Sequence, residues 1–127
     1  MQRSGAFYLE SQVVLAWPGE EGTLHIHAST QNTSEIQQVV AEALGLRFHE
    51  VVCVCRRMGG GFGGKETQAS IPAVMAALTA NKLNRPARVV LTKDDDMHTT
   101  GKRHPFRINY QVAFTDAGQI TGLNVEL

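Results

Sequence analysis

The sequence predicts an α+β fold: a mixed sheet and two main helices in two layers, with a β-hairpin at each end of the chain. Short segments near both ends alternate apolar and polar residues at the two-residue period of strands. Two longer segments between them carry apolar residues at helical spacing. The length of 127 residues suits one core, so we expect residues 1–127 to form a single domain.

A hairpin is predicted near the start of the chain. Residues 13–17 form a short apolar segment, and residues 18–22 contain the glycine and proline of a turn. Residues 24–28 alternate apolar side chains with His25 and His27, which predicts a strand with one buried and one wetter face. The spacing of the two histidines would also suit metal ligands, but we favour a place on the polar face.

The first predicted helix follows a polar segment. Its apolar face is formed by Ile36, Val39, Val40, Ala43 and Leu44. Two pairs could supply the N-cap and its partner three residues later: Asn32 with Glu35, or Ser34 with Gln37. Gly45 is placed to end the helix in a left-handed conformation.

The second predicted helix begins near residues 67–70 and ends by residues 84–86. One apolar face is predicted from the spacing of Ile71, Val74, Met75 and Leu78. Pro72 is compatible with this helix only in its first turn. An apolar, β-branched strand is predicted before it, at residues 51–55.

The end of the chain predicts three more strands. Residues 88–92 form one, and the three aspartates within residues 93–97 favour a solvated turn or a short helix start over a metal site. Residues 106–114 alternate apolar and polar side chains throughout, and residues 116–119 turn the chain back into residues 123–127. The last two segments therefore predict a second hairpin.

Charge and hydropathy argue against two classes of partner. The chain has 12 basic and 12 acidic residues, so its formal net charge is zero with neutral histidines. A neutral chain lacks the electrostatic footprint that binds nucleic acid or an anionic membrane. No segment approaches the ~18 to 20 apolar residues of a membrane span. We therefore expect no nucleic acid, no membrane and a cytoplasmic location.

Cys53 and Cys55 are the only cysteines, and both are predicted on the same side of one strand. A C-x-C pair can bind metal, but no second pair of cysteines or histidines lies at ligand spacing. We favour buried free thiols.

The most informative stretch is the glycine loop, which we define as Gly59–Lys65. It joins the strand at residues 51–55 to the second helix. Glycine is costly to order on folding, so a run of glycines indicates close backbone approach or backbone angles that a Cβ forbids. A strand, a glycine loop and a helix in this order can direct backbone N–H groups at an anionic ligand.

Two nucleotide motifs match the loop in part. Gly59, Gly61 and Gly64 fit the dinucleotide pattern G-x-G-x-x-G, but the nearest acidic candidates, residues 94–96, lie well beyond the ~20 residues that this motif requires. The loop also resembles a P-loop, except that Glu66 stands where a Ser or Thr should bind Mg²⁺. A stand-alone nucleotide- or phosphate-binding module therefore remains the alternative hypothesis.

A pocket for a large polar cofactor and a flat substrate suits the residues better. Phe62 offers an apolar wall, or else anchors the loop to the core. Gln31, at the junction of a strand and a helix, has an amide that both donates and accepts hydrogen bonds, or it simply caps the turn. Glu66 can accept hydrogen bonds from the N–H groups of a heterocycle, or it is an exposed carboxylate near a helix start.

Four segments of the chain resemble, in family order, the molybdenum-binding large subunit of the xanthine dehydrogenase family. They are Phe7–Glu10, Ser29–Thr33, Arg56–Thr67 and Gly101–Phe106. The long glycine motif is the most specific of the four, and xanthine oxidases, aldehyde oxidases and carbon monoxide dehydrogenases share the general pattern. The resemblance covers nearly the whole chain.

The resemblance implies a molybdenum–molybdopterin cofactor at the glycine loop. The glutamine at the position of Gln31 hydrogen-bonds an oxo ligand of the molybdenum in this family. The backbone at Phe62 and Gly63 lies against the molybdenum centre, and glycines such as Gly60 and Gly61 make room for the pterin. Gln31 and Phe62 are therefore expected near the metal, without direct protein ligation.

The resemblance also implies a substrate and a reaction. Glu66 matches the purine-orienting glutamate of xanthine dehydrogenases, which aldehyde oxidases usually lack. The implied activity is hydroxylation of a purine (hypoxanthine or xanthine to urate) at a carbon next to a ring nitrogen. Electrons would leave through iron–sulfur clusters and FAD, in another subunit or domain, to NAD.

Two departures limit this interpretation. The catalytic base glutamate of the family is expected beyond residue 127, and the cysteines here cannot carry an iron–sulfur cluster. We therefore expect residues 1–127 to be a fragment of the molybdopterin-binding region, dependent on the rest of the large subunit and without turnover alone. Arg103 and His104 fall in a family motif, but the sequence assigns them no role.

Overall fold

The computed structural model describes residues 8–101 and 106–126. The elements run in the order β1 (Val13–Pro18), β2 (Leu24–Ala28), α1 (Thr33–Leu44), β3 (Val51–Val54), α2 (Ser70–Leu83), β4 (Ala87–Val90), α3 (Lys93–Thr99), β5 (Asn109–Phe114) and β6 (Ile120–Glu126). Single 3₁₀ turns at Glu20–Gly22 and Phe48–Glu50 lie before β2 and β3. Arg103, His104 and Leu127 lie outside the described residues.

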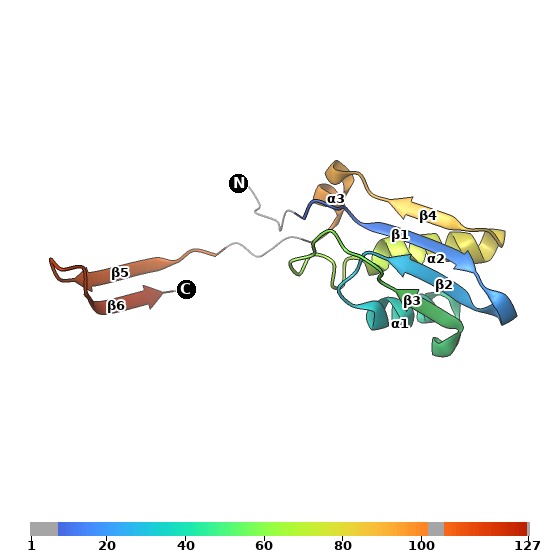
Figure 1. Ribbon diagram of the computed structural model, residues 1–127, viewed down its shortest axis with the longest axis horizontal. Coiled ribbons are helices and arrows are strands. Elements are labelled where there is room, and N and C mark those ends of the chain that lie inside the picture. The colour runs from blue at the N-terminus through green and yellow to red at the C-terminus, as the bar shows by residue number, and fades with distance from the viewer. Residues whose placement is uncertain (1–7, 102–105, 127) are drawn as a thin grey trace.

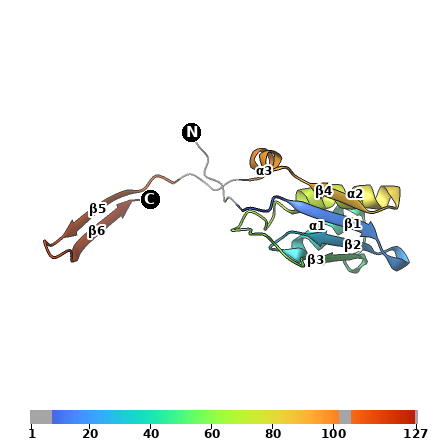
Figure 2. The ribbon, with the colours of Figure 1, turned by 45° about the horizontal axis from the view of Figure 1, so that its top comes forward.

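Four strands form a mixed sheet in the order β3-β2-β1-β4. β1 pairs antiparallel with β2 and β4, whereas β2 and β3 are parallel and are connected through α1. Both long helices pack on the same face of this sheet (Figures 1 and 2). The predicted α+β class, with two main helices and a hairpin at each end, is confirmed.

The first hairpin supplies the centre of the core. Val14 and Ala16 of β1 point to the helices together with Leu24 and Ile26 of β2, and all four are almost completely buried. The opposite, wetter face carries both histidines, as their alternation predicted. There the Trp17 ring stacks on the ring of His25 and meets that of His27 edge-on, with centroid distances of 5.5 and 4.8 Å.

The ends of α1 follow the first of the two capping alternatives. Asn32 accepts a hydrogen bond from the backbone N–H of Glu35 at 3.1 Å, and its amide donates to the Glu35 carboxylate at 3.1 Å. At the other end, Gly45 is left-handed with φ of 66°. The structure therefore confirms the predicted C-terminal end at Gly45 and selects Asn32 from the two N-cap candidates.

The buried face of α2 differs from the predicted one. Ile71, Met75 and Leu78 are more than half exposed. Most core contacts come from the small residues Ala69, Pro72, Ala73, Ala76, Ala77 and Ala80. Val74, the fourth residue of the predicted face, is partly buried and packs against this core. Because these side chains are small, the helix backbone can lie close to β1 and α1. The helix is apolar nearly all round, so spacing alone could not tell the two faces apart.

The aspartates after β4 lie in a short helix, α3. Thr92 caps it by accepting from the backbone N–H of Asp95 at 3.1 Å. Asp96 is buried and accepts a hydrogen bond from the Tyr8 hydroxyl at 2.9 Å. This bond ties the helix to the segment before β1.

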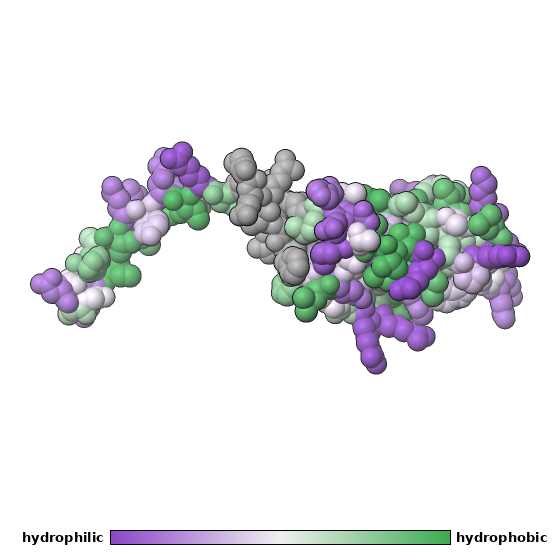
Figure 3. Space-filling view, turned by 90° about the horizontal axis from the view of Figure 1, so that it is seen from above, coloured by the Kyte–Doolittle hydropathy of each residue, from purple (hydrophilic) through white to green (hydrophobic). Residues whose placement is uncertain are grey.

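The last two strands form a separate two-stranded sheet. The predicted strand at residues 106–114 is regular only from Asn109 onwards. In the register of the pair, Tyr110 faces Val125 and Val112 faces Leu123, so one face is continuous and apolar. Every residue of both strands is exposed, and apolar side chains run along the hairpin at the left of Figure 3.

Candidate glycine-loop site

A tight turn forms the tip of the glycine loop. The Gly64 N–H donates to the Gly61 carbonyl at 2.7 Å, and the two residues between them have positive φ, 49° at Phe62 and 79° at Gly63. Positive φ at both central positions is typical of a type I′ turn. Such a conformation costs a residue with a side chain about 1–3 kcal/mol. The turn thus holds the Phe62 ring at the surface, 68% exposed.

Gln31 lies beside this turn, between the end of β2 and the start of α1. Its side-chain Oε1 accepts from the backbone N–H groups of Gly63, at 2.9 Å, and Lys65, at 3.3 Å. Two backbone donors fix which branch of the amide is the oxygen. Among the residues that the structure describes, the Gln31 amide nitrogen makes no hydrogen bond to the protein, and the side chain is exposed. Gln31 therefore presents N–H donors to the surface beside the loop.

Close approach explains three of the glycines. A Cβ at Gly61 would lie 2.5 Å from the Gln31 Oε1 atom, and a Cβ at Gly64 would lie 2.5 Å from the Tyr8 ring. Gly60 has φ of 97°, and a Cβ there would come within 3.3 Å of the Tyr8 side chain. The glycines let the loop lie directly against Gln31 and Tyr8.

Lys65 ends the loop with a side chain that is completely buried. Its ammonium donates to the carboxylate of Glu10 and to the hydroxyl of Ser29, both at 2.8 Å. It also lies 4.9 Å from the centre of the Tyr8 ring, within the range of a cation–π contact. The Ser29 hydroxyl in turn hydrogen-bonds Glu10.

Glu10 connects the two ends of the loop. Besides Lys65 and Ser29, its carboxylate accepts from the backbone N–H of Gly59 at 2.8 Å. Partial burial alone would raise the pKa of Glu10, but the hydrogen bonds from Lys65, Ser29 and Gly59 outweigh it and lower this pKa to about 2. Glu10 is therefore ionised at neutral pH and pairs with the Lys65 ammonium.

A second polar network, formed by Tyr8, Gln12 and Asp96, supports the loop. Gln12 donates to the Tyr8 hydroxyl at 3.1 Å and to the Gly64 carbonyl at 3.0 Å. Burial, together with the hydrogen bond to Asp96, raises the pKa of Tyr8, so its phenol stays protonated and donates to that carboxylate. The network was not evident from the sequence, because Gly64 and Asp96 lie far along the chain from Tyr8 and Gln12.

Glu66 follows directly and is exposed, in the segment between the turn and α2. Among the described residues its carboxylate has neither a hydrogen bond nor an ion pair to the protein. The structure thus brings Gln31, Gly61 and Gly63 into contact and leaves Phe62 and Glu66 at the surface. The predicted site residues are therefore Gln31 and members of one short segment, residues 60–66, that lies beside it.

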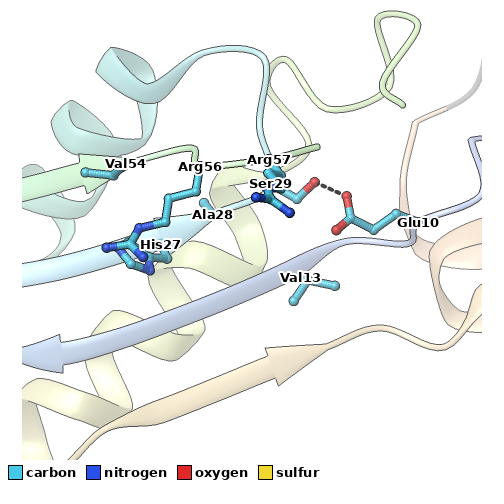
Figure 4. Close-up of a pocket in the computed structure, with 8 residues that line it drawn as sticks. All are labelled: Glu10, Val13, His27, Ala28, Ser29, Val54, Arg56 and Arg57. Atoms are coloured by element: carbon cyan, nitrogen blue, oxygen red, sulfur yellow. Dashed lines mark hydrogen bonds between the residues drawn. The ribbon is translucent and has the colours of Figure 1, made fainter. Parts of the chain in front are cut away.

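A cavity of about 350 Å³ lies next to the loop and not at its tip. It is lined by Glu10, Val13, His27, Ala28, Ser29, Val54, Arg56 and Arg57 (Figure 4). In Figure 4 the Arg56 side chain extends toward His27, and Glu10 bonds Ser29 at the other end. This cavity does not include Gln31, Phe62 or Glu66. Half of its lining comes from the segments that carry the family resemblance, namely Glu10, Ser29, Arg56 and Arg57.

The described residues contain no group of three or more His, Cys, Asp or Glu side chains that could hold a metal ion. Cys53 and Cys55 are free thiols, as predicted. Both are only partly buried, whereas we expected them to be buried. Burial, with a smaller contribution from Cys55, raises the pKa of Cys53 to about 11. Within residues 8–101 and 106–126, no helix has the length and apolar character needed to cross a membrane.

The fold and the site define an α+β domain whose candidate binding site is made of loop backbone and one amide. The sequence profile of the molybdopterin cofactor-binding domain family matches residues 1–127, and the chain belongs to this family. The resemblance drawn from the four sequence motifs is confirmed.

Two relatives and two solved structures illustrate the match. The chain is 47% identical over 120 residues to xanthine dehydrogenase of Calliphora vicina, and 45% identical over 120 residues to xanthine dehydrogenase/oxidase of Rattus norvegicus. Aldehyde oxidoreductase from Desulfovibrio gigas superposes on 93% of the chain with a TM-score of 0.74 at 26% identity. CO dehydrogenase from Oligotropha carboxidovorans superposes on 97% with a TM-score of 0.74 at 24% identity, which supports the fold alone.

The chain spans only a small part of each of these proteins. Each of the two alignments with relatives includes 94% of this chain but only 9% of the relative's own length. The two solved chains are covered over 13% and 15% of theirs.

Proposed function

We propose that this chain is the part of a xanthine dehydrogenase-type molybdenum hydroxylase that forms one wall of the cofactor and substrate pocket. The observation that carries the proposal is the Gln31 amide, whose oxygen is held by two loop N–H groups so that its nitrogen faces outward. An N–H donor fixed in this way suits an oxygen ligand of a bound metal. We further propose that residues 1–127 act as one unit of the larger subunit.

The residues fit a molybdenum–molybdopterin cofactor. Gln31 leaves no room for a Cβ at position 61, and Gly60 and Gly63 have positive φ, a conformation that glycine adopts readily. Gln31, Phe62 and Gly63 would hold the cofactor, with the backbone at Gly60 and Gly61 making room for the pterin. When bound, the molybdenum supplies the hydroxylation and redox chemistry.

The chain's own residues would then bind and orient. The Gln31 nitrogen donates a hydrogen bond toward the cofactor, and the exposed Phe62 ring gives the pocket an apolar wall that excludes water. Glu66, which has no partner among the described residues, is placed to accept hydrogen bonds from the N–H groups of a purine.

The remaining steps fall outside this chain. We propose that a glutamate beyond residue 127 acts as the base, and that iron–sulfur clusters and FAD elsewhere in the enzyme pass electrons to NAD. The xanthine dehydrogenase names of two similar relatives support a purine substrate over an aldehyde. The two free cysteines suit the reducing cytoplasm.

Two observations count against the rival nucleotide- or phosphate-binding module. A P-loop lysine must reach the phosphates, but the Lys65 ammonium is buried against Glu10 and Ser29. The helix that would bind phosphate does not begin until Ser70, several residues after the last glycine.

The test uses the full open reading frame that contains this sequence. We would quantify molybdenum and assay xanthine-dependent NAD reduction in the wild type and in Glu66→Ala, with Glu42→Ala on the exposed side of α1 as the matched control. Bound molybdenum, with activity that falls at least about a hundredfold in Glu66→Ala only, is expected. Full activity in Glu66→Ala would remove the substrate role, and absence of molybdenum would overturn the proposed function.

A further inference from the structure

We propose that Lys65 is a positioning residue, whose buried ammonium, clamped by Glu10 and Ser29, holds the glycine loop closed and thereby sets the direction of the Gln31 amide. The effect of the Gln31 direction on a bound metal rests on the cofactor role proposed above. The loop-closing contact itself stands on geometry alone, so it can be tested separately.

The side chain of Lys65 anchors the loop to the ends of two core strands. Glu10 lies just before β1, and Ser29 directly follows β2. The ammonium reaches both at 2.8 Å from a completely buried position. Since β1 and β2 form the centre of the sheet, Lys65 fixes the end of the loop to the most buried part of the fold.

The main chain of the same residue positions Gln31. The Lys65 carbonyl accepts from the Gln31 backbone N–H at 2.9 Å and from the Thr30 hydroxyl at 3.0 Å. The Lys65 N–H donates to the Gln31 side-chain oxygen at 3.3 Å. A displacement of Lys65 therefore releases Gln31 at both its backbone and its side chain.

One oxygen atom closes the loop. The Oε2 atom of Glu10 accepts from the Gly59 N–H, the Lys65 ammonium and the Ser29 hydroxyl. Gly59 and Lys65 are the first and last residues of the loop, so both ends meet at this atom. We call this arrangement the Glu10–Lys65 latch.

The burial of Lys65 excludes other roles for it. An ammonium with no exposed surface, two hydrogen bonds and a ring at 4.9 Å cannot reach a ligand at the loop tip. Removing one member of a buried ion pair leaves the other uncompensated, which is strongly destabilising locally. Removing both leaves no unpaired charge, so the double variant should destabilise the loop by less than the sum of the two single changes.

The experiment compares Lys65→Met with Lys82→Met, an exposed lysine on α2, in the full open reading frame. Amide hydrogen exchange is read at residues 59–65 and at β1, β2 and α2. The molybdenum content and the electron paramagnetic resonance spectrum of the bound metal are recorded in parallel.

We expect at least about tenfold faster exchange at the glycine loop in Lys65→Met, with little change in the strands. We expect an altered resonance spectrum in those molecules that retain metal, because the Gln31 donor has moved. Lys82→Met should match the wild type in both measurements. Glu10→Gln should reproduce the loop effect, and Glu10→Gln with Lys65→Met should exchange more slowly than the two single effects combined.

Unchanged loop exchange in Lys65→Met, or equal acceleration in all strands, would overturn the latch. If Lys65→Met does not fold, Glu10→Gln decides, since it removes the charge at the partly exposed member of the pair. An unchanged spectrum with an open loop would overturn the positioning of Gln31. A wild type without molybdenum would refute the proposed function, while the exchange result would still judge the latch.

Discussion

The chain contains two antiparallel hairpins with the same kind of alternation and opposite surroundings. In the β1–β2 hairpin the apolar face lies under α1 and α2, and Ile26 is completely buried. In the β5–β6 hairpin the apolar face is equally continuous, but Val112 is 38% exposed and Tyr110 70%. The first hairpin stands at the centre of a sheet, whereas, among the residues described, the strands of the second pair only with each other (Figure 1).

The difference shows what alternation can and cannot establish. A period of two decides which side chains share a face, and it did so correctly in both hairpins. It does not decide what covers that face. For β1–β2 the cover is the two helices that follow in the chain, whereas no described element covers β5–β6.

The largest expected contrast is in hydrogen exchange of the two hairpins in the 127-residue chain. Amides of β1 and β2 should open only with global unfolding, at about 5–15 kcal/mol. Amides of β5 and β6 should exchange almost without protection, because an isolated two-stranded hairpin is marginally stable. Equal protection of the two hairpins would contradict the contrast. If the protection of β5 and β6 then rose with protein concentration, it would reveal self-association.

Core truncation should give the next largest effect. Ile26→Ala removes a fully buried side chain beneath both helices and should cost about 2–5 kcal/mol of unfolding free energy. Val112→Ala, on the exposed hairpin, should stay within about 0.5 kcal/mol. Urea unfolding of the two variants measures both. A comparable cost at Val112 in the full open reading frame would mean that another segment covers β5–β6 there.

Capping of α1, one of the two helices that cover the inner hairpin, should contribute about 1 kcal/mol. Asn32→Ala loses the hydrogen bond to the Glu35 N–H and should lower the stability by that amount in thermal unfolding. Ser34→Ala serves as the control because Ser34 is exposed and does not cap the helix. Equal effects of the two changes would restore the capping alternative that the structure rejected.

Acidification should distinguish the glycine loop from both hairpins, with no effect at neutral pH. The pKa of Glu10 is lowered in the folded protein to about 2 from its ordinary value near 4.5. The stabilisation is therefore complete above pH 4.5 and is lost as the pH falls toward 2. Exchange at residues 59–65 is read from pH 5 to 2 and divided by the intrinsic amide exchange rate at each pH. The protection of these amides should fall in this window. In Glu10→Gln the window should be absent, and its persistence there would assign it to another group.

Local chemistry allowed much of the fold to be predicted. The C-terminal end of α1 followed from Gly45, and the N-terminal end was narrowed to Asn32 or Ser34, because caps depend on single residues and backbone angles. The buried face of α2 could not be predicted, since alanines line one side of the helix and larger apolar residues the other, and only the close approach to the sheet selects the alanines. Composition carries no information about that distance.

The candidate site was predicted unevenly for a similar reason. The glycine run is a local signal, and Gln31 was found because it stands at the junction of a strand and a helix. Lys65 and Glu10 each have an ordinary charged side chain in the sequence, 55 positions apart. Only folding brings them together, so no spacing rule could have identified the pair.

The Glu10–Lys65 latch has a consequence for the order of folding. It joins residues 55 positions apart, and the supporting bond from Tyr8 to Asp96 joins residues 88 apart. Contacts of such long range form only after the intervening strands have paired, since chain closure costs entropy first. We expect Lys65→Met to speed unfolding while leaving the refolding rate nearly unchanged, as stopped-flow kinetics would measure. A chain that has not completed its sheet would then lack the shaped loop, and cofactor insertion would be confined to protein that has already folded.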